Sequence, residues 1–205
     1  MIALLTVPLA AALFAGAGWV GTLAADAVCA GRAPFDDGPQ PVAFRRWPFA
    51  LAGACIGAVL AVHGAPPAQL AVLVLVTFAL AGCTAADLAC GILPDVFTLG
   101  ALALVVGLRI AAHDPTPVLG AAFAFAPFAA AAIFSRGRGM GWGDVKLAAL
   151  GGALLGARDA TLAFTLAAIA AYVIARRTGG ARRPIAFGPY LAASIVATLA
   201  VVKVY

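Results

Sequence analysis

Long, almost uncharged apolar segments constrain the fold of this chain more than any other feature of its sequence. A helix that crosses a bilayer needs about 20 apolar residues, and runs of roughly that length recur along the chain. Of the 205 residues, 64% are hydrophobic and only 10% are charged, whereas soluble domains are about one quarter charged. The core of a soluble domain cannot absorb this excess, so the sequence predicts an all-α, polytopic transmembrane helical bundle.

About eight hydrophobic segments are expected, which corresponds to six to eight spans. They cover residues 2–28, 47–62, 68–86, 96–112, 118–134, 145–156, 160–175 and 185–202. The predicted organisation is a first transmembrane helix (1–28), a short polar loop (29–47) and a membrane domain (48–205). The first segment lacks a basic leader region, so it is interpreted as a retained span rather than a cleaved signal peptide.

Basic residues gather in alternate loops. The stretches 29–47, 135–143 and 176–184 hold nine of the thirteen Lys and Arg residues. Cytoplasmic loops carry such an excess, so these three loops are predicted to lie in the cytoplasm and the N-terminus outside. No stretch interleaves basic and aromatic residues as a nucleic-acid surface does, so no nucleic-acid partner is expected.

Three aspartates fall at the predicted cytoplasmic ends of hydrophobic segments. Asp95 directly follows Pro94 and precedes an apolar run, which is the position of a helix N-cap. Asp87 ends an apolar run of some twenty residues. A carboxylate there is costly unless it is solvated or partnered, so Asp87 is a candidate functional residue.

The third aspartate, Asp144, ends the sequence GMGWGD (139–144) and allows two interpretations. It either caps the helix that follows, with Lys146 extending to the membrane interface, or forms part of a catalytic site. In the second case Gly139, Gly141 and Gly143 permit close approach of another helix or a substrate. A functional Asp144 is expected to meet Asp87 from a different helix.

Two neighbouring carboxylates can carry out peptide hydrolysis, because one activates water while the other donates a proton. His63 and His113 both fall on the predicted external side, so no Ser–His or Cys–His arrangement competes. The four cysteines (29, 55, 83 and 90) form no CxxC pair, and most are expected to be small apolar fillers. The sequence therefore predicts neither a metal site nor a cofactor.

Three ordered motifs resemble those of the type IV prepilin peptidases, which are GxGD-type intramembrane aspartyl proteases. They are DLACGILPD (87–95), GMGWGDVKL (139–147) and FGPYLAAS (187–194). The resemblance extends from about residue 47 to the C-terminus, so 48–205 is expected to be a prepilin-peptidase-like membrane domain.

This resemblance implies an aspartic endopeptidase of the bacterial inner membrane that removes the short basic leader of prepilins or pseudopilins after a glycine, with the site facing the cytoplasm. Its expected partners are this substrate and the lipid bilayer, and the sequence does not indicate an oligomeric state. The roles implied by the motifs are catalysis for Asp87 and Asp144, a non-catalytic place for Pro94 and Asp95, charge stabilisation for Lys146, and packing or substrate contact for Gly188 and Pro189.

The chain departs from the larger members of that family in one respect. Those members carry a cysteine-rich cytoplasmic insert between the first two helices, which is linked to N-methylation. This chain has only the short loop 29–47 with a single Cys29. The resemblance therefore supports a short, peptidase-only form and does not support methyltransferase activity.

A small proton-coupled transporter or channel that uses the same two aspartates is the alternative function. Intramembrane acids occur in such proteins as well. A transport path should offer polar residues at several depths, yet the predicted spans consist almost entirely of Ala, Leu, Val, Gly and Phe. This composition favours the peptidase.

Overall fold

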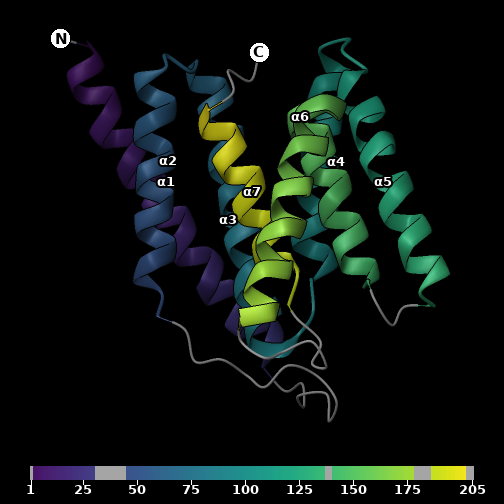
Figure 1. The fold of residues 1–205 in the computed structure, drawn as a ribbon. Helices are drawn as coiled ribbons and strands as arrows, with labels where there is room; N and C mark the ends of the chain where they lie inside the picture. The colour runs from purple at the N-terminus through teal and green to yellow at the C-terminus, as the bar shows by residue number, and fades with distance from the viewer. Residues whose placement is uncertain (1, 31–44, 137–139, 178–185, 202–205) are drawn as a thin grey trace.

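Seven helices make up the part of the chain that the computed structural model describes, namely residues 2–30, 45–136, 140–177 and 186–201 (Figure 1). The helices are α1 (Ile2–Cys29), α2 (Trp47–Val62), α3 (Pro67–Cys90), α4 (Asp95–Ala111), α5 (Thr116–Phe134), α6 (Trp142–Arg177) and α7 (Gly188–Val201). No strand occurs in these ranges, so the predicted all-α class is confirmed. Most of the predicted loop 29–47 and Gly139 lie outside the described residues.

The helix named α6 consists of two arms that fold back on each other at Gly156. The backbone there has φ 76° and ψ 171°, a non-helical conformation that favours glycine. A Cβ atom built on Gly151 would lie 2.6 Å from the ring of Phe164, although residues thirteen positions apart in a straight helix are about 20 Å apart. The expected segments 145–156 and 160–175 are therefore the two arms of one helical hairpin.

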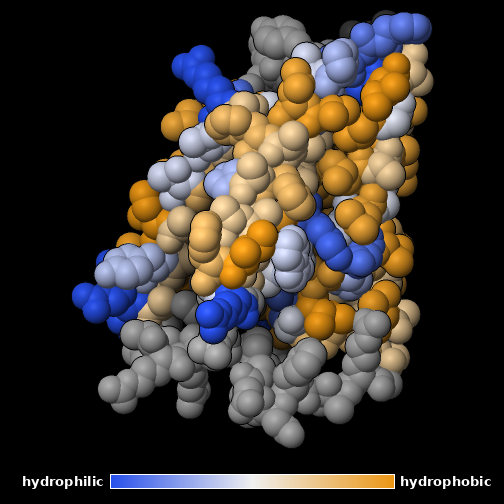
Figure 2. All heavy atoms as spheres, turned by 90° about the vertical axis from the view of Figure 1, so that its right-hand side faces the viewer, coloured by the Kyte–Doolittle hydropathy of each residue, from blue (hydrophilic) through white to orange (hydrophobic). Residues whose placement is uncertain are grey.

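Large apolar side chains lie both in the core and on the outside of the bundle. Phe14, Leu150 and Ile195 are completely buried. The exposed large hydrophobic side chains include Leu119, Phe123, Leu166 and Ile169, and Figure 2 shows hydrophobic side chains over most of the face that it presents. An apolar exterior around an apolar core is what a bundle surrounded by lipid requires.

Four helices are long and apolar enough to cross a membrane, judged by length and composition among the described residues: Leu5–Cys29 of α1, then α3, α5 and α6. The 36 residues of α6 include both of its arms. These four helices make the chain a multi-pass membrane protein. The expected six to eight spans exceed this number, because α2, α4 and α7 have only 16, 17 and 14 residues. At a rise of 1.5 Å per residue, such helices measure about 21–26 Å.

The contact between α5 and the first arm of α6 depends on two glycines that face each other. A Cβ atom on Gly152 would lie 2.6 Å from the Cβ atom of Ala124 and would also press on the backbone of Gly120. Small residues of this kind let membrane helices approach closely. By contrast, a Cβ atom on Gly107 of α4 would meet nothing within 4 Å.

Gly152→Ala is therefore expected to destabilise the purified protein, because the added methyl group overpacks the α5–α6 contact by about 1–3 kcal/mol. In a chain of this length each kcal/mol lowers Tm by roughly 2–4 °C. Thermal unfolding in detergent measures the change, with Gly107→Ala as the matched control. An equal Tm for both variants would contradict the close α5–α6 contact.

Candidate active site

The two candidate aspartates come from different helices at the same end of the bundle. Asp87 lies in the last turn of α3, and Asp144 lies in the first turn of α6. Helix α3 ends because Gly91 adopts a left-handed conformation (φ 66°) and returns its N–H to the carbonyl of Asp87. Pro94 then precedes the first residue of α4. The first motif therefore contains a helix end, a tight connection and a helix start.

Asp87 is buried, with only 7% of its surface exposed. Its Oδ2 atom accepts a hydrogen bond of 3.0 Å from the backbone N–H of Gly188, 101 positions later in the chain. Gly188 is the first residue of α7, so the donor belongs to a helix N-terminus, where backbone N–H groups favour negative charge. A Cβ atom on Gly188 would lie 2.7 Å from Oδ2 of Asp87, so only glycine leaves room for this contact.

Leu93 connects the surroundings of the two aspartates. A Cβ atom on Gly143 would lie 2.7 Å from the Cβ atom of Leu93, and one on Gly188 would lie 3.0 Å from its Cδ2 atom. The residue before Asp144 and the hydrogen-bond donor of Asp87 thus pack against the same side chain. Asp144 directly follows Gly143, and Asp87 accepts from Gly188, so both carboxylates belong to the surroundings of Leu93. Sequence analysis did not single out Leu93, since one leucine in so apolar a chain carries no signal.

The Asp144 carboxylate uses its two oxygens differently. Oδ2 accepts a hydrogen bond of 3.3 Å from the N–H of Gly141, whose carbonyl receives the first bonds of α6. This contact corresponds to half of a capping box, so Asp144 does help to cap its helix. Oδ1 is buried and has no hydrogen-bond partner among the described residues. Buried polar atoms normally have partners, so Oδ1 is the oxygen that capping leaves for another role.

Asp95 is not the N-cap that the sequence predicts. Pro94 occupies the cap position, no side chain caps this helix, and Asp95 is already the first helical residue. Its Oδ1 instead lies 2.6 Å from Nζ of Lys146 on α6. Since 60% of the Asp95 side chain is exposed, this ion pair contributes little to stability. It does connect the start of α4 to the turn that carries Asp144.

Pro189 follows Gly188 in the first turn of α7 and lines an apolar groove. Among the described residues, no three His, Cys, Asp or Glu side chains gather closely enough to hold a metal ion.

Two cysteines pair at the same end of the bundle. Cys29, the last residue of α1, lies within disulfide-bonding distance of Cys90, the last residue of α3, and their Cα atoms are 6.2 Å apart. The expectation that most cysteines are small apolar fillers therefore does not hold for this pair. Because 61 positions separate the two residues, no local pattern could have indicated the contact.

Comparison with known proteins identifies the family. The model of the type IV leader peptidase family matches residues 70–176, more than half of the 205 residues. The chain therefore belongs to the type IV leader peptidase family, and the resemblance based on three motifs is confirmed at that level. The matched stretch contains both Asp87 and Asp144 but not Gly188. No curated protein and no solved structure matches the chain.

The cysteine pair provides a test of orientation. The charge distribution predicts that this end faces the cytoplasm, where thiols are kept reduced. In a variant that keeps only Cys29 and Cys90 (Cys55→Ser with Cys83→Ala), both are therefore expected to be free thiols in cells. Cells are quenched with acid, and the protein is denatured and treated with a maleimide mass tag. Without any reductant, the protein band should shift by the mass of two tags.

A sample without maleimide marks the gel position of the untagged protein. A sample that is reduced before tagging marks the position of the protein with two tags. If tags appear only after reduction, the disulfide exists in the cell. The end of the bundle that carries Asp87 and Asp144 would then face the oxidising side, and the predicted orientation would be wrong.

Proposed function

We propose that this protein is an integral-membrane aspartic endopeptidase that removes the short basic leader of type IV prepilins or pseudopilins at the cytoplasmic face of the bacterial inner membrane. The observation that carries the proposal is the arrangement of Asp87 and Asp144 around Leu93. Two carboxylates from separate helices lie at one end of an apolar bundle, each beside a glycine that packs against Leu93. Family membership supports the same reaction class.

The hydrogen bonds of the site suggest how the two carboxylates divide their tasks. Oδ2 of Asp87 accepts a hydrogen bond from the backbone N–H of Gly188, and Oδ2 of Asp144 accepts one from the backbone N–H of Gly141. These bonds orient the carboxylates and leave the Oδ1 atoms for chemistry. Two carboxylates that act on one bond must lie close together, and like charges in one site disfavour double ionisation, so the proposed pair works with one shared proton.

Hydrolysis then follows as general acid–base catalysis. The ionised carboxylate takes a proton from a water molecule as its oxygen attacks the scissile carbonyl carbon. The protonated carboxylate gives its proton to the carbonyl oxygen, which forms the tetrahedral intermediate. When that intermediate collapses, the C–N bond breaks and the leaving nitrogen takes up the proton that came from water. A hydroxyl of the intermediate returns its proton to the other carboxylate, which restores the starting pair.

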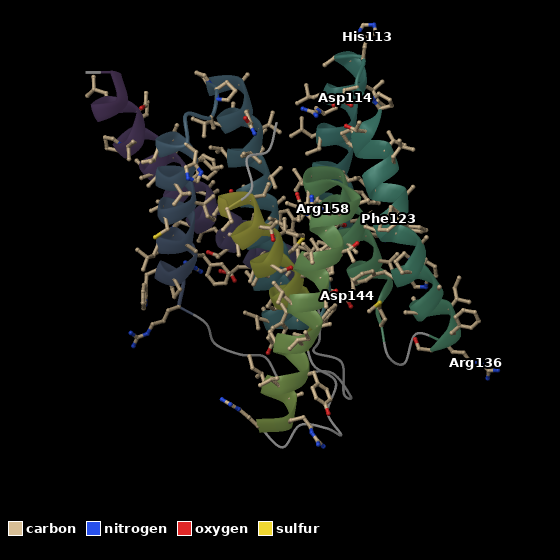
Figure 3. The ribbon with its side chains drawn as sticks, turned by 45° about the horizontal axis from the view of Figure 1, so that its top comes forward. His113, Asp114, Phe123, Arg136, Asp144 and Arg158 are labelled. Carbon is tan, nitrogen blue, oxygen red and sulfur yellow. A yellow bond between two sulfur atoms is a disulfide. The ribbon has the colours of Figure 1, made fainter. Side chains whose placement is uncertain are left out.

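The distribution of charge supports a cytoplasmic site. Six of the eight basic residues that the structure describes lie at the end that carries the aspartates: Arg45, Arg46, Arg136, Lys146, Arg176 and Arg177. Arg109 and Arg158 lie toward the other end. Figure 3 shows His113 and Asp114 at the end of the bundle opposite to Arg136. This asymmetry follows the rule that basic residues remain inside.

The alternative of a proton-coupled transporter or channel gains no support from the interior. The buried polar side chains of the described residues are Asp87 and three threonines, Thr22, Thr77 and Thr98. Each threonine hydroxyl donates to a carbonyl of the preceding turn. These hydroxyls are therefore occupied locally and do not form a chain of polar groups leading away from Asp87.

Asp87→Asn and Asp144→Asn, tested singly, are each expected to reduce leader cleavage by at least about 1,000-fold, because each removes one member of an acid–base pair that acts as a unit. The measurement is co-expression with an epitope-tagged prepilin from the same genome, followed by a gel shift and N-terminal sequencing of the product. Asp159→Asn, at the other end of the bundle, is the matched control. Normal processing by either site variant would exclude the two-aspartate mechanism.

Gly188→Ala tests the hydrogen bond that holds Asp87. The added methyl group would lie 2.7 Å from Oδ2 of Asp87, so it displaces the carboxylate, and the cleavage rate is expected to fall at least about 10-fold, since small misplacements of catalytic groups have effects of this order. Gly100→Ala on α4, where a Cβ atom meets nothing within 4 Å, should cleave at the wild-type rate. If the two variants cleave equally fast, the contact between Gly188 and Asp87 is not needed for catalysis.

A further inference from the structure

An apolar groove leads from the membrane-facing side of the bundle to the aspartate site. It has a volume of about 320 Å³ and lies between α2, α3 and α7. Its α7 side runs from Pro189 to Ala197, about 12 Å at 1.5 Å per residue. One end of the groove adjoins the aspartate site. At that end Pro189 directly follows Gly188, and Thr84 on α3 lies one turn before Asp87.

The walls of this groove offer almost nothing polar to an occupant. Apart from two threonines, its lining consists of Pro, Phe, Ala, Gly, Ile, Leu and Val. The hydroxyls of Thr77 and Thr84 each donate to the carbonyl four positions earlier, at 2.8 Å. A polar or charged peptide segment would leave its own groups without partners there, so only an apolar segment fits.

The groove is also open to the lipid side. Ala52 of α2 and Ala193 and Ala197 of α7 line it and are exposed. These small side chains leave the space between α2 and α7 accessible to a chain that already lies in the membrane. A substrate segment could therefore enter sideways from the bilayer and reach Asp87 without crossing the packed core.

From this continuity we infer that the α2–α3–α7 groove binds the apolar segment of the substrate on the membrane side of the scissile bond. The inference rests on the proposed peptidase function and adds the place where the substrate docks. With the apolar segment along α7, the scissile bond lies at the level of Gly188 and Asp87. The polar leader then remains at the aqueous end of the bundle.

A second groove provides a matched control. It has a similar volume, about 370 Å³, and is lined by apolar residues of α5 and α6 and two threonines. Its lining includes Ala168, which is exposed as Ala193 is. None of its lining residues lies within one turn of Asp87, Asp144 or Gly188 along the chain, so an occupant there would not be led to the aspartates.

The first experiment fills each groove with one large side chain. Ala193→Phe is expected to reduce cleavage of the co-expressed prepilin at least 10-fold, whereas Ala168→Phe should stay within about 2-fold of wild type. Size-exclusion chromatography in detergent checks that both variants fold. Cleavage by Ala193→Phe at the wild-type rate would overturn the groove assignment.

The second experiment detects the contact directly and does not depend on turnover. The photocrosslinker p-benzoylphenylalanine is placed at position 193 or 168 in the Asp144→Asn background and irradiated in membranes that contain the same prepilin. The expected result is a crosslink from position 193 to the apolar segment of the prepilin and none from position 168. Crosslinks only to lipid, only to the leader, or equally from both positions would overturn the proposal.

The two proposals fail in different ways. If Asp87→Asn or Asp144→Asn still cleaves, the peptidase mechanism is wrong whatever the crosslinks show. If both aspartate variants are inactive but position 193 does not contact the apolar segment, the peptidase stands and the substrate docks elsewhere.

Discussion

The hydrogen bond from the Gly188 N–H to Asp87 is the interaction on which the site depends. A carboxylate with 7% exposure in an apolar bundle needs a partner, and the described residues provide that partner from the N-terminus of α7. The bond brings the last helix against the end of α3. It also explains why the third motif contains a glycine, because a side chain there would collide with the carboxylate.

The short connection between α3 and α4 is the second constraint. Gly91 ends one helix and Pro94 precedes the next, so Leu93 is placed between Gly143 and Gly188. The fixed spacing between Asp87 and Asp95 thus has a physical meaning. It brings one aspartate into the site and places the other at the start of α4, where it pairs with Lys146 beside Asp144.

The remainder of the bundle surrounds the site with apolar side chains and, among the described residues, contributes no other buried Asp, Lys, Arg or His side chain. Its buried threonines bond to their own helices, and the α2–α3–α7 groove and the α5–α6 groove are lined almost entirely by apolar side chains. The buried carboxylate among the described residues, that of Asp87, lies at one end of the bundle. Such a division suits a substrate that is apolar within the membrane and polar outside it.

Much of the fold was predictable because the preference of a helix for lipid depends on the apolar residues in its own segment of the sequence. Runs of apolar residues identify membrane helices, and the limits 47–62 and 118–134 agree closely with α2 and α5. The eight-segment pattern even anticipated the two arms of α6. Only the structure shows that they form a hairpin at Gly156, because nothing in the sequence distinguishes this glycine from the other 22. The span count was too high, since sequence reasoning counted apolar segments that form short helices.

The sequence by itself determined the membrane class, the family and the two aspartates to consider, since all of these depend on composition or on short motifs. Tertiary structure alone decided the partners: Gly188 for Asp87, Lys146 for Asp95, and Cys90 for Cys29. These partners are 101, 51 and 61 positions apart. Asp95 shows the reason most clearly. Its neighbours favour a cap, but the position of a lysine on another helix determines what its carboxylate binds.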